Sequence, residues 1–408
     1  MRSTKYLLIG GGLASSHAAK EIRAGDPEGS ILLAGEERHL PYDRPPLSKE
    51  FLRGEKTREE IACEPESFYR EQRIDLALGA RVQALDPAAK IATLADGETI
   101  SFKKALIATG GRPVRLDLPG VAFPGVHTLR TLDDAVAIAA EAGPGKRALL
   151  VGAGFIGLEL AASLTQRGLQ VTVVETEARI WPRFTDVRLA DHVQAYCEGK
   201  GVTFVTGDAI AEIEENEVIH SVSTRNGKQI RCDLVCIGVG IVPNVELARE
   251  AGLAVDNGIV VDDRMRTSHP DIYAAGDVVS YPDPIFERRR RVEHWGHAEH
   301  TGQIAGQNMA GGQQTYDLVT YVWSDLFDLH LEFAGDESEY DEAIIRGSLE
   351  ENAFIQLYLK GGRLRAYFAI NGNAKDFPLL QRLIRQRKDL SARKAVLGDA
   401  DFALRGLL

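Results

Sequence analysis

Glycines spaced for a tight turn between a strand and a helix are the residues in this sequence best suited to chemistry. Gly152, Gly154 and Gly157 have the spacing G-x-G-x-x-G, after an apolar run at 148–151 and before an apolar-periodic segment at 158–166. In such a unit the first glycine makes the turn, the second lets the backbone approach a pyrophosphate, and the third lets helix and strand pack closely. The spacing therefore predicts a dinucleotide site with the helix N-terminus facing the phosphates.

An acidic residue follows this unit at the expected distance. Glu175 ends a second β-branched run at 171–174. A carboxylate at this position accepts hydrogen bonds from the ribose 2′- and 3′-hydroxyls and repels a 2′-phosphate. The sequence therefore predicts a preference for NADH over NADPH.

The chain contains a second pattern of the same kind near its start. Gly10 and Gly12 follow an apolar run, Ser15 occupies the third small position, and Glu36 follows the next strand-like run. Two dinucleotide folds in one chain usually bind two different dinucleotides, commonly FAD at the N-terminal site and a nicotinamide at the internal one. The pairing is typical of a flavoprotein that takes hydride from a pyridine nucleotide.

Composition limits the remaining classes of function. The chain has 408 residues, 44% of them apolar and 26% charged, which suits a globular protein of about two to four domains. Its net charge of −11 argues against general binding of nucleic acid. No apolar run approaches the ~20 residues that span a bilayer, and the N-terminal apolar run passes directly into the first glycine turn, so it is expected to be a strand and not a signal peptide. A cytoplasmic protein is expected.

Four cysteines, Cys63, Cys197, Cys232 and Cys236, show no C-x-x-C spacing. Cys232 and Cys236 lie in a β-like run and are expected to be buried small apolar residues. Many flavoproteins with two dinucleotide folds are disulfide reductases with a redox-active cysteine pair, and the sequence does not predict that chemistry.

A proline-rich loop after Glu36 carries two cations. Arg44 and Lys49 lie in and just after a segment, 41–46, with three prolines, which stiffen the backbone. Beside a flavin, we expect Arg44 to contact the pyrophosphate and Lys49 to reach the isoalloxazine ring. The alternative is a solvated basic loop.

Further candidates lie where predicted strands end. Thr109 and Gly110 follow one strand, and Gly276 and Asp277 follow another. Glycine turns at strand ends let a cofactor approach the backbone, and the Asp277 carboxylate is placed to meet ribityl or ribose hydroxyls. A structural aspartate at a turn is the alternative.

The last third of the chain adds aromatic candidates. A helix is predicted from 298 to 309, and its N-terminus near His297 could direct its positive end at the flavin N1/O2 edge. The final segment, about 320–408, favours a small α+β domain. Within it, Trp323 is either a core residue or a flavin-facing aromatic.

Several motifs together resemble one family. They are Arg44-Pro45-Pro46-Leu47-Ser48-Lys49, Gly157-Leu158-Glu159, Gly276-Asp277 and Trp323-Ser324-Asp325. With these motifs in the same order over essentially the whole chain, the sequence resembles the NADH-dependent FAD ferredoxin reductases of oxygenase systems, the type of putidaredoxin reductase and the reductases of aromatic-ring dioxygenases. The stretches 291–294 and 297–298 are also similar to apoptosis-inducing factor.

The resemblance implies an α/β fold with two Rossmann-like domains, for FAD and NAD, and a C-terminal α+β domain. It implies a discontinuous FAD-binding domain at 1–114 and 242–319, an NADH-binding domain at 115–241 and a C-terminal domain at 320–408. The implied FAD contacts are Gly10, Gly12, Ser15, Glu36, Arg44, Thr109, Gly110 and Asp277. Gly276, Trp295, Trp323 and Lys49 are further candidates for cofactor binding. The implied NADH contacts are Gly152, Gly154, Gly157 and Glu175.

Lys49 and Glu159 match a Lys–Glu pair beside the flavin N5, and they are the candidate catalytic residues. The side chains at His294, Trp295 and His297 differ from those expected in the dioxygenase reductases, which leaves the electron acceptor open. The implied acceptor is an iron–sulfur ferredoxin or a rubredoxin-like redoxin, for a chain that is a monomer or homodimer and needs no metal, membrane or nucleic acid.

Two alternatives stay open at this point. One is an oxidoreductase like apoptosis-inducing factor, with redox-controlled assembly, and the other is a monodehydroascorbate or quinone reductase. A pure binding module would leave two dinucleotide folds unexplained.

An acidic redoxin would need a cationic surface on this acidic chain. The candidates are the run Arg288 to Arg291 and a basic helix, expected at 377–388, with Arg382, Arg385, Arg387 and Lys388. For the arginine run, a solvated strand edge neutralised by Glu287 and Glu293 is the alternative.

Overall fold

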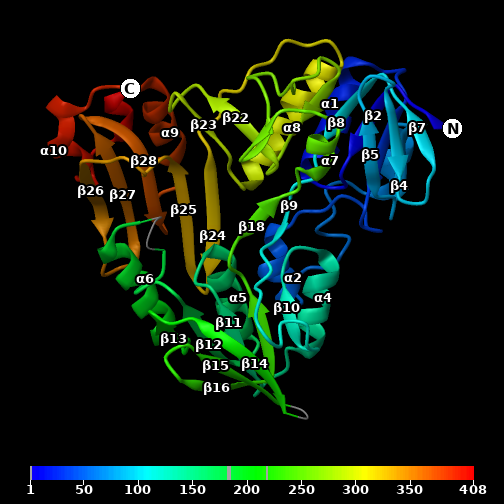
Figure 1. Cartoon of the computed structure of the whole chain (residues 1–408). Coiled ribbons are helices and arrows are strands. Elements are labelled where there is room, and N and C mark those ends of the chain that lie inside the picture. Colours follow the sequence, from blue (N-terminus) through cyan, green and yellow to red (C-terminus); the bar gives the residue numbers. More distant parts are fainter. Residues whose placement is uncertain (1, 182–184, 217–218) are drawn as a thin grey trace. The chain divides into compact units, whose positions relative to one another are not determined.

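Two five-stranded parallel sheets, each next to a glycine-rich turn, organise the chain in the computed structural model, which describes residues 2–181, 185–216 and 219–408 (Figure 1). The chain divides into two units. Unit 1 comprises 1–43, 58–112 and 242–322. Unit 2 comprises 44–57, 113–241 and 323–408.

The parallel sheet of unit 1 has the order β21-β8-β2-β3-β4. Its strands are β2 (Tyr6–Ile9), β3 (Ile31–Gly35), β4 (Ile74–Leu78), β8 (Lys104–Ile107) and β21 (Ile272–Ala274). The central strands are short apolar runs, as expected for a parallel sheet covered on both faces, and every residue of β2 and β3 is buried.

Helices α1 (Leu13–Gly25) and α8 (Trp295–Met309) pack against each other in unit 1. A side chain at Gly302 would put its Cβ 2.4 Å from the carbonyl oxygen of Ala14, and one at Gly306 would put it 2.5 Å from that of Ala18. These two glycines therefore allow the close approach of the helices, which fixes α8 beside the first glycine turn.

Smaller elements complete unit 1. One sheet consists of β1 (Arg2–Ser3), β7 (Thr99–Ser101), β6 (Ile91–Leu94) and β5 (Val82–Asp86). Another consists of β19 (Val255–Asp256), β20 (Gly258–Val260), β22 (Val279–Asp283) and β23 (Arg288–Arg290). The short helices are α3 (Glu66–Glu71) and α7 (Glu246–Glu250).

The parallel sheet of unit 2 has the order β10-β17-β11-β12-β13. The strands are β10 (Val126–Thr128), β11 (Arg147–Val151), β12 (Gln170–Glu175), β13 (Thr203–Thr206) and β17 (Leu234–Ile237). The accompanying helices are α4 (Leu132–Glu141), α5 (Phe155–Gln166) and α6 (Val187–Gly199). A three-stranded antiparallel sheet joins β14 (Ile210–Asn216), β15 (Ile219–Thr224) and β16 (Gln229–Cys232).

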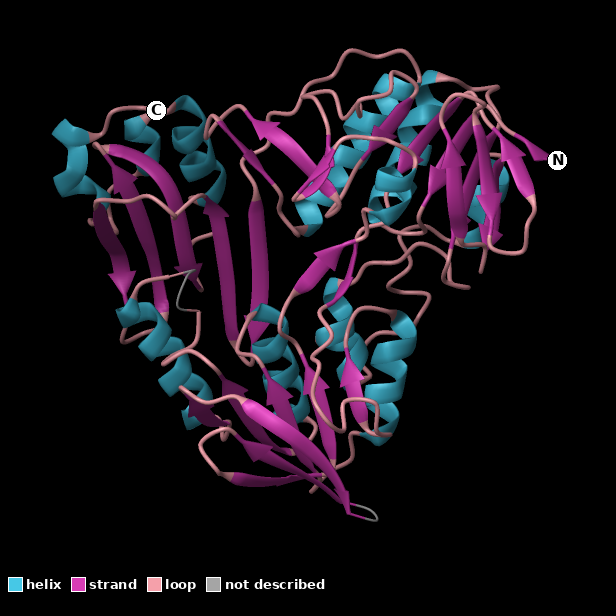
Figure 2. Ribbon diagram, in the orientation of Figure 1, coloured by secondary structure: helices cyan, strands magenta, loops and turns pink. Residues whose placement is uncertain are grey.

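The rest of unit 2 includes a C-terminal antiparallel sheet, seen as the long strands in Figure 2. Its strands, in spatial order, are β24 (Tyr321–Leu326), β25 (Leu329–Gly335), β28 (Arg363–Ile370), β27 (Ala353–Lys360) and β26 (Glu342–Ser348). Helix α9 (Phe377–Gln386) packs on this sheet, and the chain ends with η2 (Ser391–Arg393), α10 (Lys394–Leu397) and η3 (Leu404–Leu407).

The proline-rich loop of unit 2 forms η1 (Pro45–Ser48) and α2 (Glu50–Arg53), and β9 (Gly111–Pro113) and β18 (Ile241–Pro243) carry the chain between the units. The predicted fold class is confirmed: two Rossmann-like parallel sheets are combined with an antiparallel C-terminal domain. Among the described residues, no helix is long and apolar enough to cross a bilayer.

Helix boundaries differ from the predictions in a consistent way. The helices expected at 158–166 and 298–309 begin three residues earlier, at Phe155 and Trp295. In α5 the helix starts within the glycine motif itself, because Gly154 is its N-cap. The basic helix expected to reach 388 ends at Gln386, and Arg387 adopts a left-handed conformation that ends it.

Candidate active site

The carboxyl ends of four parallel strands in unit 1 bring together predicted residues that are distant in sequence. Gly10 follows β2, Glu36 follows β3, Thr109 lies beyond β8, and Gly276 lies beyond β21. These strands are neighbours and run parallel, so their carboxyl ends lie at one edge of the sheet. In open α/β sheets this edge is where ligands bind.

The glycines of the first turn have separate physical roles. Gly10 has a φ of +119°, and a Cβ there would lie 2.2 Å from the carbonyl oxygen of Ala108, so the fold itself requires glycine. A Cβ at Gly12 would meet nothing within 4 Å. The chain's own packing therefore does not explain Gly12, whereas close approach of a ligand to the backbone does.

The second turn, in unit 2, repeats this division. A Cβ at Gly152 would lie 2.6 Å from the Gly238 carbonyl oxygen, and one at Gly157 would lie 2.1 Å from that of Gly152. At Gly154 it would meet nothing within 4 Å. In both turns, the glycine at the second of the three motif positions, Gly12 or Gly154, leaves open space beside the backbone.

The helices that follow these turns also lack a side-chain cap, among the residues that the structure describes. Two other helices of unit 2 are capped: Thr131 accepts from the Asp134 N–H at 3.1 Å in α4, and Asp186 accepts from the Leu189 N–H at 3.0 Å in α6. The first-turn N–H groups of α1 and α5 are thus left for an anion. Ser15, in α1, adds a buried hydroxyl without a hydrogen-bond partner in the described part of the chain. These features fit one dinucleotide pyrophosphate at each of the two turns.

The acidic residues after the second strands differ in their surroundings. Glu175 lies against its own glycine turn, where its Oε2 accepts from the Ala153 N–H at 2.7 Å. Its Oε1 accepts from the Glu177 N–H at 3.0 Å, so the carboxylate is held at the end of β12. The side chain of Glu36 in unit 1 is 72% exposed and lies 3.8 Å from an Arg81 nitrogen.

Hydrogen bonds fix the remaining strand ends of unit 1. The Thr109 hydroxyl donates to the Asn244 carbonyl at 2.8 Å, and the Asn244 amide donates back to the Thr109 carbonyl at 2.9 Å. The Gly276 N–H donates to the Thr301 hydroxyl of α8 at 2.9 Å, which holds the turn before Asp277 against that helix. The hydroxyl of Thr109 thus already has a structural acceptor.

The N-terminus of α8 contains the residues that differ from the family resemblance. The Trp295 indole N–H donates to an Asp43 carboxylate oxygen at 2.7 Å. His297 is fully buried, packs against the Tyr281 ring and lies 3.0 Å from the Tyr316 hydroxyl through its Nδ1. Burial, aided by the neighbouring histidines and Arg290, lowers the pKa of His297 well below its usual value, so its imidazole is neutral at pH 7.

His294 precedes this helix as its N-cap residue, and it is neutral for the same reason. Burial, with a smaller contribution from Arg290, lowers the pKa of His294 to about 4. These two imidazoles therefore add no positive charge at the start of α8 near neutral pH.

In unit 2 the structure brings Lys49 and Glu159 together. The Lys49 ammonium lies 3.0 Å from Glu159 Oε1, and both side chains are only 4% exposed. Ser324, on β24, donates to the same oxygen at 2.7 Å, and Ser48 donates to Glu159 Oε2. Both serines belong to the motifs that carry the family resemblance, but no local pattern predicts that their hydroxyls meet one carboxylate.

The other predicted residues of unit 2 are placed as follows. An Arg44 guanidinium N–H donates to the Arg130 carbonyl, just before α4, so part of this guanidinium anchors the loop. Trp323 precedes Ser324 on β24 and is half-buried.

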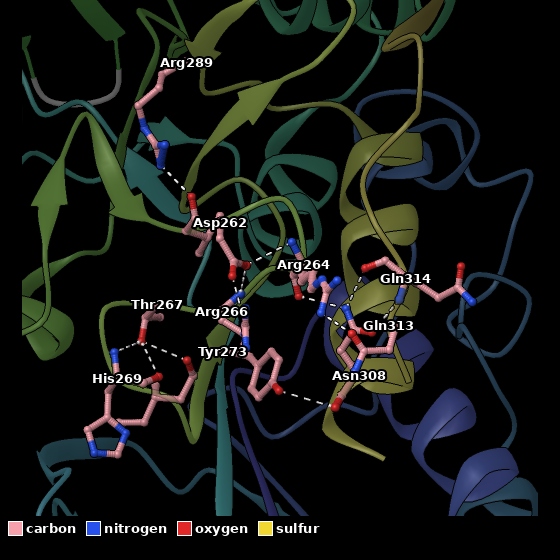
Figure 3. A network of polar contacts seen from close by, with 12 residues as sticks. Asp262, Arg264, Arg266, Thr267, His269, Tyr273, Arg289, Asn308, Gln313 and Gln314 are labelled. Carbon is pink, nitrogen blue, oxygen red and sulfur yellow. Dashed lines mark hydrogen bonds and ion pairs between the residues drawn. The ribbon is translucent and has the colours of Figure 1, made fainter. Parts of the chain in front are cut away.

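Arg289, Arg290 and Arg291 form hydrogen bonds or ion pairs within unit 1. Arg290 forms a 3.0 Å ion pair with the buried Asp283. Arg289, labelled in Figure 3, donates to the Val261 and Ser280 carbonyls at 2.6 and 2.9 Å. Arg291 pairs with Glu293 at 2.6 Å. The alternative of a solvated strand edge is therefore wrong for Arg290, whose side chain pairs with the buried Asp283. Replacing Arg289 and Arg290 by glutamate would break these contacts of the fold.

The four cysteines are free and lie within the described residues. Burial raises the pKa of the thiols of Cys63, Cys197, Cys232 and Cys236 to about 12. Reactive thiolates are therefore disfavoured near neutral pH.

Comparison with known proteins identifies two family segments. Residues 4–302 match the family model described as pyridine nucleotide-disulphide oxidoreductase, and residues 321–408 match one described as reductase C-terminal.

Individual relatives cover nearly the whole chain. A probable ferredoxin reductase, CtmF, from Castellaniella defragrans is 36% identical over 96% of this chain and 96% of its own length. Human apoptosis-inducing factor 3 is 33% identical over 90% of this chain and 61% of its own length. A crystal structure of the covalent putidaredoxin reductase–putidaredoxin complex contains a chain with 31% identity and a TM-score of 0.94, covering 100% of this chain and 98% of that one.

The two open glycines give a test of the dinucleotide sites. Gly12→Ala and Gly154→Ala add a methyl group that meets no protein atom, so both variants should keep the thermal stability of the apoprotein. We expect Gly12→Ala to weaken FAD retention and Gly154→Ala to raise the KM for NADH, each by about tenfold, which corresponds to ~1.4 kcal/mol. Flavin absorbance per chain and steady-state kinetics measure the two effects.

Gly10→Ala and Gly157→Ala are the matched controls, because their methyl groups would collide with backbone carbonyls. These two should lose stability before any ligand is added. Full FAD retention and an unchanged KM for NADH in the Gly12 and Gly154 variants would contradict the binding of the cofactor phosphates at the two turns.

Proposed function

Since the chain belongs to the pyridine nucleotide-disulphide oxidoreductase family, among its FAD- and NADH-dependent ferredoxin reductases, we propose that it passes electrons from NADH to a small redoxin of an oxygenase system. The acceptor would be an iron–sulfur ferredoxin or a rubredoxin-like protein. The observation that carries the proposal is the pair of glycine turns, each followed by an uncapped helix and each with an open middle glycine.

The two turns would hold different dinucleotides. FAD, when bound, supplies the redox chemistry: it accepts a hydride from NADH and returns the electrons singly to the acceptor. In unit 1, the N–H groups of α1 would bind the FAD pyrophosphate, Glu36 its ribose hydroxyls and Asp277 the ribityl chain. Gly110, Gly276 and Trp295 line the same strand ends.

The turn of unit 2 would hold NADH. The N–H groups of α5 would bind its pyrophosphate, and Glu175 its adenosine ribose. Because Glu175 is already oriented by the Ala153 and Glu177 N–H groups, a 2′-phosphate would meet a fixed carboxylate. Like-charge repulsion and desolvation then favour NADH over NADPH.

Lys49 and Glu159 would form the charged centre beside the flavin. The ammonium of Lys49 supplies positive charge where negative charge develops, and the Glu159 carboxylate holds it in one position. In a buried pair this interaction is screened little by salt. Arg44 would contact the FAD pyrophosphate, and Trp323 would face the isoalloxazine ring.

The domain assignment follows from these roles. We propose an FAD-binding domain at 1–114 and 242–319, an NADH-binding domain at 115–241 and a C-terminal domain at 320–408. The loop 44–57 packs within unit 2, although it carries residues that we assign to FAD. A cytoplasmic location and a monomeric or homodimeric state complete the proposal.

The reaction itself is tested by pairing donors with acceptors. We expect kcat/KM with NADH to exceed kcat/KM with NADPH by about a hundredfold or more. Glu175→Ala should reduce this preference, because it lowers kcat/KM for NADH and raises kcat/KM for NADPH. With NADH, turnover should be fast for a redoxin and slow for quinones and monodehydroascorbate. Equal kcat/KM for the two nucleotides in the wild type, or turnover confined to a small organic acceptor, would contradict the proposal.

Docking of the acidic acceptor can be tested on α9. Its apolar face is buried through Phe377, Leu380 and Leu383, and Arg382 and Arg385 are exposed. Electrostatic steering to such a surface raises the association rate and weakens with ionic strength. We expect Arg382→Glu with Arg385→Glu to lower redoxin reduction by about tenfold at low salt, with NADH–ferricyanide activity retained.

The matched control reverses two exposed arginines of the β15–β16 region, Arg225→Glu and Arg231→Glu. It makes the same change in net charge at another surface, so redoxin reduction should stay near the wild-type rate. If both double variants respond equally across a salt titration, net charge and not α9 governs the association.

A further inference from the structure

The carboxylate of Glu159 is the meeting point of three chain segments in unit 2. Glu159 lies on α5, Lys49 and Ser48 lie at the end of the proline-rich loop, and Ser324 lies on β24 of the C-terminal sheet. All four side chains are buried, and Ser324 is fully so. The Lys49–Glu159 pair is separated by 110 positions in sequence, and Ser324 is 165 positions from Glu159.

A buried carboxylate of this kind depends on its donors. Removing an ion pair from water costs free energy, which the mutual attraction offsets only when the remaining lone pairs also find hydrogen bonds. Lys49 and Ser324 both donate to Oε1, at 3.0 and 2.7 Å, and Ser48 donates to Oε2. The two hydroxyls therefore fix the orientation of the carboxylate that the ammonium pairs with.

The two serines are not equivalent. Ser48 is tied to α5 a second time, because the Ser163 hydroxyl donates to its carbonyl at 2.7 Å. Ser324 reaches α5 from another sheet, and its side-chain bond to Glu159 is the one it makes among the described residues. The hydroxyl of Ser324 thus links the C-terminal sheet to the charged centre.

We propose that Ser324 is a positioning residue, whose hydroxyl holds Glu159 so that the Lys49 ammonium keeps its place for hydride transfer. An ammonium has three donors, and among the described residues Glu159 is the acceptor that the structure gives it. If Glu159 rotates, the ammonium follows this acceptor. The C-terminal domain therefore contributes to the NADH half-reaction through a hydroxyl, and not only to contact with the acceptor protein.

The residues next to Ser324 on β24 lie on the other face of the strand. Asp325, the next residue, is 2.7 Å from the His330 ring nitrogen, and within the described part of the chain it forms no hydrogen bond with Glu159. Because side chains alternate along a strand, Ser324 points into unit 2, while Trp323 and Asp325 point to the opposite face.

The test compares Ser324→Ala, which deletes the hydroxyl, with Ser324→Thr, which retains one. In oxidised, FAD-loaded protein without NADH, infrared spectra identify the Glu159 carboxylate bands as those that Glu159→Gln removes. We expect Ser324→Ala to shift these bands and Ser324→Thr to leave them near the wild-type position. We also expect Ser324→Ala to slow flavin reduction by NADH about fivefold to tenfold, with an unchanged KM for NADH.

Tyr358→Phe is the control for losing a buried hydroxyl in the same sheet, since the Tyr358 hydroxyl bonds Thr185 at 2.9 Å and does not contact Glu159. It should change neither readout. Unshifted bands and an unchanged reduction rate in Ser324→Ala would overturn the proposal, as would an equal response in Tyr358→Phe.

A second variant keeps the test decisive if Ser324→Ala fails to fold. Ser48→Ala removes the donor to the other carboxylate oxygen, so it should shift the same bands and slow reduction; no shift would overturn the positioning role of the hydroxyls. The inference rests on the proposed function for its rate readout alone. A wild type that shows the bands but is not reduced by NADH would contradict the proposed function and leave the carboxylate geometry standing.

Discussion

A charged pair sealed away from water is the interaction on which unit 2 depends. Lys49 and Glu159 are 4% exposed, and the cost of burying them is offset by their attraction and by two hydroxyl donors. These donors and the pair come from the proline-rich loop, α5 and β24. Loss of the loop or of α5 would leave a buried charge without its partner, and loss of β24 would remove one hydrogen bond to the carboxylate. The pair therefore favours one arrangement of the three segments.

The same helix serves two purposes because of where it begins. α5 starts at Phe155, directly after the open Gly154, and Glu159 lies only five positions beyond that glycine. We propose that its N-terminus binds the NADH pyrophosphate, while its second turn carries the carboxylate of the buried pair. On this proposal, one helix positions both the nucleotide and Glu159.

Local features of this molecule were predictable from sequence, and long-range ones were not. The glycine turns were found because a strand, a turn and a helix are encoded within a few tens of residues, with Glu175 at the end of the next strand. No spacing rule connects Lys49 with Glu159, and only the resemblance to a family paired them. Ser324 belongs to the motif Trp323-Ser324-Asp325, but its role could not be predicted, because its hydrogen bond to Glu159 depends on the packing of the C-terminal sheet. The surroundings of the arginine run could not be predicted for a similar reason. Arg290 pairs with the buried Asp283, and the run of charges does not indicate this partner.

We propose that the Lys49–Glu159 pair acts as one unit, and a double-mutant cycle on the hydride-transfer step tests this most directly. The rate of flavin reduction by NADH is measured anaerobically in Lys49→Met, Glu159→Gln and the double variant, each with FAD bound. If the residues act as a unit, each single change slows reduction by about tenfold or more, and the double variant is no slower than the slower single one. Unchanged rates in the single variants, or a double variant that shows the full product of two independent losses, would contradict the account.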